Sequence, residues 1–87
     1  MEATVPIVNS LGLHARPAAE FVKTSARFAA NVIVRKDSLE VNGKSIMGMM
    51  MLAAERGSEL YIRTEGDDAE AALAALVALI AAGFGEQ

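Results

Sequence analysis

The spacing of the apolar positions changes several times along the chain, and each spacing predicts one kind of element. Four stretches are rich in β-branched residues or alternate between apolar and polar side chains, as strands do: residues 4–8, 31–36, 39–42 and 59–65. Pro6 favours an edge position for the first strand, because proline has no N–H to donate to a neighbouring strand. The turn at residues 36–38 predicts a hairpin between the second and third strands. In the fourth strand one face is predicted to carry Leu60, Ile62 and Thr64.

Helical spacing begins after the first strand. Pro17 is tolerated only in the first turn of a helix, so the first helix is predicted to start at about Ala15–Pro17. Its apolar face continues with a 3.6-residue period through Ala18, Phe21, Val22, Ser25, Phe28 and Ala29.

Two further helices are predicted in the second half of the chain. Ser45 is a favourable N-cap for a short helix from Ile46 to about Ala54. The last helix covers about Ala69–Ala82, and Gly83 is suited to end it. Acidic residues stabilise the positive N-terminal end of a helix dipole, and here they are Asp67, Asp68 and Glu70. The expected core stripe of this helix is Leu73, Leu76, Val77 and Ile80.

The predicted order is β-α-β-β-α-β-α in a single domain covering residues 1–87. Mostly alternating strands indicate an antiparallel sheet with helices on one face. The chain has no cysteine and one histidine, which excludes disulfides, thiolate metal sites and a histidine pair for a metal. We therefore expect no cofactor and a reducing, cytoplasmic location.

Charge and hydropathy exclude two further classes of protein. The net charge of −3 argues against a general nucleic-acid binder. The alanine-rich stretch 71–82 is shorter than the roughly 20 residues that a membrane span needs, and the N-terminus lacks the features of a secretory signal. We expect neither nucleic-acid binding nor membrane insertion.

The single histidine, His14, stands where a loop is predicted to become a helix. The first turn of a helix has unpaired N–H groups and partial positive charge, which together suit an anion. Arg16 adds a permanently charged fork of donors that fits phosphate oxygens. A positive surrounding disfavours imidazolium, so we expect a neutral, nucleophilic ring. Such a ring can receive a phosphoryl group and release it again, because neutral imidazole is a good leaving group.

The same residues also have plainer interpretations, which the sequence leaves open. Gly12 can be an ordinary turn glycine, His14 a helix cap or a surface residue, and Pro17 only a helix starter. The more basic first half of the chain (residues 1–44, with six basic and four acidic residues) suits an anionic substrate, but the imbalance is small.

Two stretches resemble a known family. Residues 12–18, Gly-Leu-His-Ala-Arg-Pro-Ala, resemble the active-site signature of HPr, the phosphocarrier protein of the bacterial phosphotransferase system. Residues 44–48, Lys-Ser-Ile-Met-Gly, resemble the second motif of that family, around its regulatory serine. The separation of the two motifs, the order of the elements and the chain length agree with the family from end to end.

The resemblance implies an α+β fold of the open-faced β-sandwich type, with four antiparallel strands and three helices on one face. It implies that phospho-enzyme I, which draws on phosphoenolpyruvate, phosphorylates His14 at Nδ1, and that the group then passes to an enzyme IIA domain in sugar uptake. Arg16 would be the active-site arginine. The protein would be a stoichiometric carrier rather than an enzyme, and we expect a monomer.

The resemblance also assigns a regulatory and a docking role. Ser45 would be phosphorylated by an HPr kinase/phosphorylase, and a phosphate at a helix N-cap is compatible with the fold. The family comparison places Ile46, Met47 and Met50 on an exposed rim near the histidine, whereas Met49 and Met51 are expected in the core. On the polar face of the first helix, Lys23 and Arg27 are candidates for contacts with an acidic partner, although a solvated helix face explains them equally well.

Two other functions compete with a phosphocarrier. One is a regulatory docking module of the same fold that carries no phosphoryl group, against which His14 and Arg16 speak. The other is RNA binding through the sheet, against which the scarcity of aromatic residues on the strands speaks. Within the family, the loop Asn9-Ser10-Leu11 is closer to nitrogen-regulatory relatives, whereas Pro17 and the surroundings of Ser45 favour the general HPr type.

Overall fold

Four strands form a single antiparallel sheet in the computed structural model, which describes residues 1–86. They are β1 (Glu2–Pro6), β2 (Asn31–Lys36), β3 (Leu39–Asn42) and β4 (Glu59–Glu65). The spatial order is β1-β4-β2-β3, so β1 and β3 are the two edges. Pro6 therefore lies in an edge strand, as predicted, where its missing N–H breaks no internal ladder.

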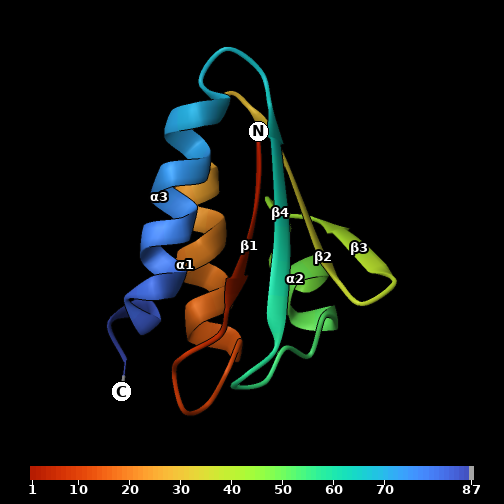
Figure 1. Cartoon of the computed structure of the whole chain (residues 1–87), viewed down its shortest axis with the longest axis vertical. Helices are drawn as coiled ribbons and strands as arrows, with labels where there is room; N and C mark the ends of the chain where they lie inside the picture. The colour runs from red at the N-terminus through yellow and green to blue at the C-terminus, as the bar shows by residue number, and fades with distance from the viewer. Residues whose placement is uncertain (87) are drawn as a thin grey trace.

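Three helices and a short 3₁₀ helix complete the fold (Figure 1): α1 (Ala15–Ser25), α2 (Ile46–Met51), α3 (Ala69–Ala81) and η1 (Gly83–Gly85). The helices pack on one face of the sheet, which confirms the predicted α+β open-faced sandwich. The chain runs β1-α1-β2-β3-α2-β4-α3, and α1 and α3 lie side by side (Figure 1).

The core lies between the helices and the covered face of the sheet. Leu60, Ile62 and Thr64 of β4 are all buried, as their alternation predicted. Phe21 of α1 is fully buried against them in the same cluster as Ile80 of α3. Burying a large apolar side chain contributes about 1.5–3 kcal/mol, so this layer stabilises α1 and with it the residues at its start.

The boundaries of the first strand and of the first helix differ from those predicted. The first strand covers residues 2–6 rather than 4–8, and Ile7 continues only irregular pairing, donating its N–H to Ser58 O at 2.8 Å. Helix α1 ends at Ser25 because the next bonds are three-residue turns, such as Phe28 N to Ser25 O, so Ala29 is exposed.

Helix α2 ends at Met51, three residues earlier than predicted. The reason is that Ala53 adopts a left-handed conformation with φ of 48°, which turns the chain away from the helix axis. The carbonyl of Ala54 then accepts a hydrogen bond from Leu13 N at 2.8 Å. The chain after α2 is thereby joined to the loop that leads to His14.

The acidic residues before α3 act differently from a simple cap. Asp68 occupies the N-cap position but makes no side-chain bond within its own helix. Its carboxylate instead accepts hydrogen bonds from the backbone N–H groups of Ala29 and Ala30, both at 2.8 Å. These bonds lower the pKa of Asp68 below its ordinary value of 3.8, and the bond from Ala29 has the largest effect. Asp68 therefore ties the start of α3 to the loop between α1 and β2.

We expect Asp68→Asn to lower the melting temperature at pH 7 by several degrees, on the order of 5 °C, because an amide oxygen cannot serve both N–H groups as a carboxylate does. A depressed pKa in the folded state stabilises the protein above the unfolded-state pKa, and this stabilisation disappears as the pH falls through the folded-state pKa. The difference in melting temperature between the wild type and Asp68→Asn should therefore become smaller below about pH 4. Thermal denaturation across this range measures it. Asp67→Asn is the matched control; an equal loss in that variant would contradict the assignment.

Within residues 1–86, no helix is both long enough and apolar enough to cross a membrane.

Candidate functional site

His14 lies at the N-cap position of α1, with φ of −80° and ψ of −172°. Its side chain makes no capping bond to the helix, so His14 is not a side-chain helix cap, which was one of its plainer interpretations. The helix start is closed by the backbone instead, since Ala18 N donates to His14 O at 3.0 Å. The imidazole is 37 % exposed and therefore accessible to a protein that approaches this end of the molecule.

Gly12 holds the loop before His14 close to the chain that follows α2. Its φ is +67°, a left-handed conformation that glycine adopts without penalty. A Cβ at this position would lie 2.5 Å from Ala54 O and 2.9 Å from Glu55 Cα. Gly12 is therefore required here both by its conformation and by close packing, which goes beyond the plain turn glycine.

The first turn of α1 offers free hydrogen-bond donors next to the imidazole. Pro17 has no N–H, so the amides of Ala15 and Arg16 are the only donors ahead of it in the helix. In the described part of the chain neither amide has a hydrogen-bond partner. These N–H groups, at the positive end of the helix dipole, suit the oxygens of an anion bound to the ring.

A carboxylate that the sequence did not suggest completes the site. Glu86 accepts from His14 Nε2 through both oxygens, with Nε2 at 3.0 Å from Oε1 and 2.9 Å from Oε2. Arg16 Nε donates to Oε2 at 3.0 Å, and Arg16 also donates to Phe84 O at 3.2 Å. Asn9 Nδ2 donates to Oε1 at 2.9 Å and to Gly12 O at 2.8 Å. One carboxylate therefore joins the imidazole, the guanidinium and the loop amide.

The 3₁₀ helix η1 brings Glu86 to this place. Gly83, Phe84 and Gly85 all have left-handed φ angles, of 64°, 56° and 74°, and this turns the chain sharply back after α3. For Phe84 such a conformation costs roughly 1–2 kcal/mol. Its side chain is only 4 % exposed, and burial of a phenylalanine contributes about 1.5–3 kcal/mol, which offsets the cost. Gly83 ends α3 as predicted.

The electrostatic surrounding of the ring differs from the purely positive one that was predicted. The carboxylate of Glu86 lies directly against the imidazole, so the helix dipole and Arg16 are not the only charges that it meets. The hydrogen bond from His14, followed by those from Asn9 and Arg16, holds the pKa of Glu86 below its ordinary value of 4.5, against the raising effect of burial. Glu86 is therefore ionised at neutral pH.

The residues around Ser45 form the second part of the site. Ser45 is the N-cap of α2 as predicted, and its Oγ accepts from Gly48 N at 3.0 Å. The exposed fractions of the large apolar side chains are 45 % for Ile46, 77 % for Met47 and 45 % for Met50. Met49 is fully buried as expected, but Met51 is 64 % exposed, so its predicted place in the core was wrong. A helix of only six residues buries a narrow stripe, and Met51 falls outside it.

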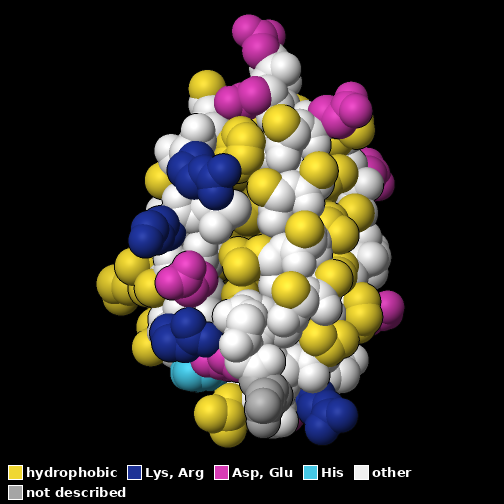
Figure 2. Space-filling view, turned by 90° about the vertical axis from the view of Figure 1, so that its left-hand side faces the viewer, with side chains coloured by type: hydrophobic (Ala, Val, Ile, Leu, Met, Phe, Trp, Pro, Cys, Tyr) yellow, Lys and Arg dark blue, Asp and Glu magenta, His cyan; other side chains and the backbone are white. Residues whose placement is uncertain are grey.

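Basic side chains follow α1 away from the imidazole. Lys23 and Arg27 are both exposed; Lys23 lies in the last turn of α1, and Arg27 lies two residues beyond its end. Figure 2 shows the imidazole at the surface, with basic side chains above it and an acidic one between them. The two residues predicted to dock a partner are thus accessible at the surface.

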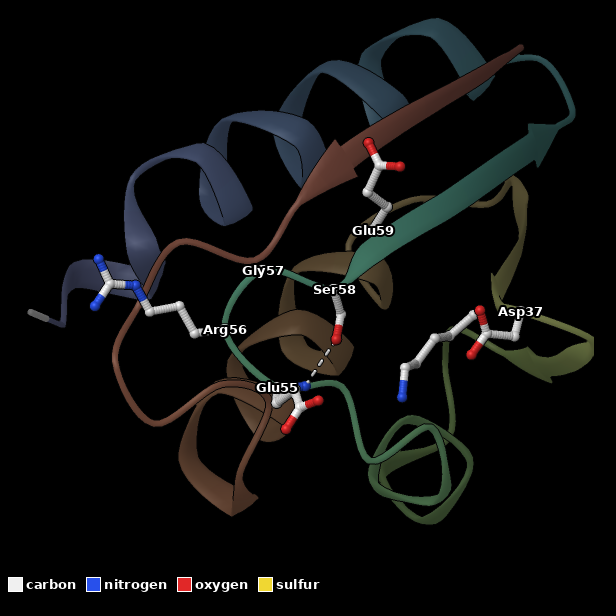
Figure 3. Close-up of a pocket in the computed structure, with 7 residues that line it drawn as sticks. Asp37, Glu55, Arg56, Gly57, Ser58 and Glu59 are labelled. Carbon is white, nitrogen blue, oxygen red and sulfur yellow. Dashed lines mark hydrogen bonds between the residues drawn. The ribbon is translucent and has the colours of Figure 1, made fainter.

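A surface pocket of about 550 Å³ lies elsewhere, before β4, and is lined by residues 36–37 and 55–59. Figure 3 shows Arg56 directed away from Asp37 and from the Ser58 hydroxyl, which accepts a hydrogen bond from Glu55 N at 3.0 Å. This pocket holds no nucleophile paired with a base, so we place the chemistry at His14 in spite of the pocket's size. Residues 1–86 contain no group of three or more side chains placed to hold a metal ion.

Comparison with known proteins gives the class of protein that this fold and site define. The family model described as "PTS HPr component phosphorylation site" matches residues 1–82. The chain belongs to the HPr family, and curated relatives in this family are named phosphocarrier protein HPr, which supports a phosphocarrier role in the phosphotransferase system.

Individual relatives agree over nearly their whole length. The chain is 45 % identical over 86 residues to the phosphocarrier protein HPr of Neisseria meningitidis, which covers 99 % of this chain and 97 % of the relative. Its structure is similar to that of HPr from Thermoanaerobacter tengcongensis, with a TM-score of 0.96, 49 % identity, and coverage of 100 % of this chain and 98 % of the other. A structure titled as an HPr dimer from the same organism is also similar, with a TM-score of 0.80, 50 % identity and 99 % coverage of both chains. The monomeric state of this chain therefore stays a prediction.

Proposed function

We propose that His14 accepts a phosphoryl group at Nδ1 from phospho-enzyme I and passes it to an enzyme IIA domain. The observation that carries the proposal is the exposed imidazole at the start of α1, beside Arg16 and two unpaired backbone amides. Arg16 is 54 % exposed, so its guanidinium can reorient toward an arriving phosphoryl group. Charge-assisted hydrogen bonds from a guanidinium and from amides are the contacts that phosphoryl oxygens favour.

The choice of Nδ1 follows from the bonds of the ring. In residues 1–86 every hydrogen bond of the imidazole goes through Nε2, to the carboxylate of Glu86. A neutral imidazole has one N–H and one lone pair. With the proton on Nε2, where a carboxylate can accept it, the lone pair is on Nδ1, which is then the nucleophile.

The test is phosphorylation of the purified chain by enzyme I and phosphoenolpyruvate. We expect one phosphoryl group per chain, labile in acid and stable in alkali, as for a phosphoramidate. Because His14 is the only histidine, a label identified as phosphohistidine can lie only on this residue. Transfer to an enzyme IIA domain should then remove the label. No label, or one that survives acid, would contradict the proposal.

Regulation at Ser45 is a second element of the proposal. A phosphate there would sit at the N-cap of α2 and meet the partial positive charge of the helix end, so the fold would persist. It would also add about two negative charges beside the exposed Ile46, Met47 and Met50. Binding of acidic partners to this surface would therefore weaken, which gives an HPr kinase/phosphorylase a physical means of control.

The exposed apolar and basic side chains near His14 form the proposed docking surface. Ile46, Met47 and Met50 offer flexible apolar contacts, and Lys23 and Arg27 offer positive charge along α1. Successive docking of enzyme I and enzyme IIA on one adaptable surface would bring each partner's histidine to the same imidazole. A docking module that carries no phosphoryl group would have no need of the exposed His14 and Arg16.

A further inference from the structure

We infer that Glu86 is a positioning residue for phosphoryl transfer: its carboxylate keeps the proton of His14 on Nε2 and stabilises the positive charge that the ring gains when Nδ1 takes the phosphoryl group. The inference rests on the proposed function of His14. It assigns a role in the reaction to a residue that lies 72 positions away from the histidine in the sequence.

The carboxylate of Glu86 is fixed by several hydrogen bonds and is not a single contact at the surface. Both oxygens of Glu86 lie within 3.0 Å of Nε2, and its side chain is 14 % exposed. Asn9, itself 1 % exposed, donates to Oε1 from a fixed position, since the same Nδ2 group donates to Gly12 O. The buried Phe84 anchors the turn that carries Glu86. The carboxylate is thus fixed from several sides before any partner arrives.

The balance of the transfer step shows what this carboxylate does. The Nδ1 lone pair attacks phosphorus, the new N–P bond forms, and the N–P bond of the donor's phosphohistidine breaks with its electron pair returning to the donor imidazole. The proton on Nε2 of His14 stays in place, so the ring of the phosphorylated product carries a positive charge. A carboxylate against Nε2–H stabilises this charge as it develops, as the aspartate of a catalytic triad does for its histidine.

The same contact serves the return step. When the phosphoryl group leaves for the next carrier, the bond electrons return to Nδ1 and the ring becomes neutral imidazole again, with its proton still on Nε2. Neither direction then needs a proton to be moved. Arg16 shares only Nε with Glu86 and uses one terminal nitrogen for Phe84 O, so the guanidinium retains donors for the phosphoryl oxygens.

The test replaces Glu86 by glutamine, which preserves shape but removes the charge. Mutation of a carboxylate that orients a metal-bound histidine typically lowers activity by a factor of about 10–100. The carboxylate of Glu86 orients its histidine in the same way, so we expect kcat for phosphoryl acceptance from enzyme I to fall by roughly that factor, with KM unchanged. Glu86→Asp should recover part of the rate. Glu70→Gln is the matched control: it makes the same change of charge near the opposite end of α3, about 17 Å along the helix from Ala81.

A second readout is independent of phosphoryl transfer. Nitrogen-15 shifts of His14 at about pH 9, where imidazoles are neutral, report which ring nitrogen carries the proton. We expect Nε2–H alone in the wild type and a measurable share of Nδ1–H in Glu86→Gln. An unchanged kcat, or a change confined to KM, would overturn the inference while leaving the carrier function intact. If the wild type takes no label at all, the proposed function fails, and the role of Glu86 in transfer fails with it.

Discussion

An alanine in place of His14 is expected to reduce phosphoryl acceptance from phospho-enzyme I to below detection, while the chain stays folded. The loss should be complete because the chain has no second histidine and no cysteine to take over as nucleophile. Stability should change little, because the imidazole makes no capping bond to α1 and is partly exposed. Labelling with phosphoenolpyruvate and enzyme I, together with thermal denaturation, measures both effects.

A second variant separates the chemistry from the local contacts. His14→Gln retains an N–H that can reach Glu86 but has no nucleophilic ring nitrogen, so it should fold like the wild type and also accept no label. If either variant kept an acid-labile label at the wild-type level, the acceptor would have to lie elsewhere. If the glutamine variant unfolded, the imidazole would be structural, and its exposure would need another explanation.

Aspartate in place of Ser45 is expected to weaken docking to enzyme I by roughly 10- to 100-fold, since like charges brought together at an interface are strongly unfavourable. Aspartate is as good an N-cap as serine, so α2 should remain intact and the effect should come from charge. The Kd for enzyme I, measured by calorimetry at low and high salt, gives the result. Added salt should reduce the difference, because exposed charges are screened.

Ser45→Asn is the matched control for this substitution. Asparagine caps a helix as well as aspartate does and has nearly the same shape, but it carries no charge. It should bind enzyme I like the wild type. Equal Kd values for the Asp and Asn variants would show that charge at this position does not control docking.

Local patterns predicted the parts of the molecule that local physics determines. Pro17 marked the start of α1, Ser45 capped α2 through Gly48 N, and the alternation of β4 identified its buried face. The two motifs around His14 and Ser45 could therefore be placed on the fold from the sequence.

What sequence reasoning missed depends on contacts between distant segments. Nothing near Glu86 in the sequence points to His14, and the glycines that flank Phe84 signal only a turn. The early end of α2 follows from the left-handed conformation of Ala53, and the bond between Leu13 and Ala54 then joins the chain beyond α2 to a separate loop. Met51 is exposed because the short α2 buries only a narrow stripe. Asp68 looked like a helix cap, but its carboxylate bonds to Ala29 and Ala30 in a loop that is nearly 40 residues away.

The bond between His14 and Glu86 also has a consequence for shortened forms of the protein. Helices α1, α2 and α3 and all four strands lie within residues 2–81, so a chain that ends before Glu86 would keep the elements of the fold. Its imidazole would lack the carboxylate, and the ring would be free to turn. Such a chain would look native by its helix content and still be a poor acceptor.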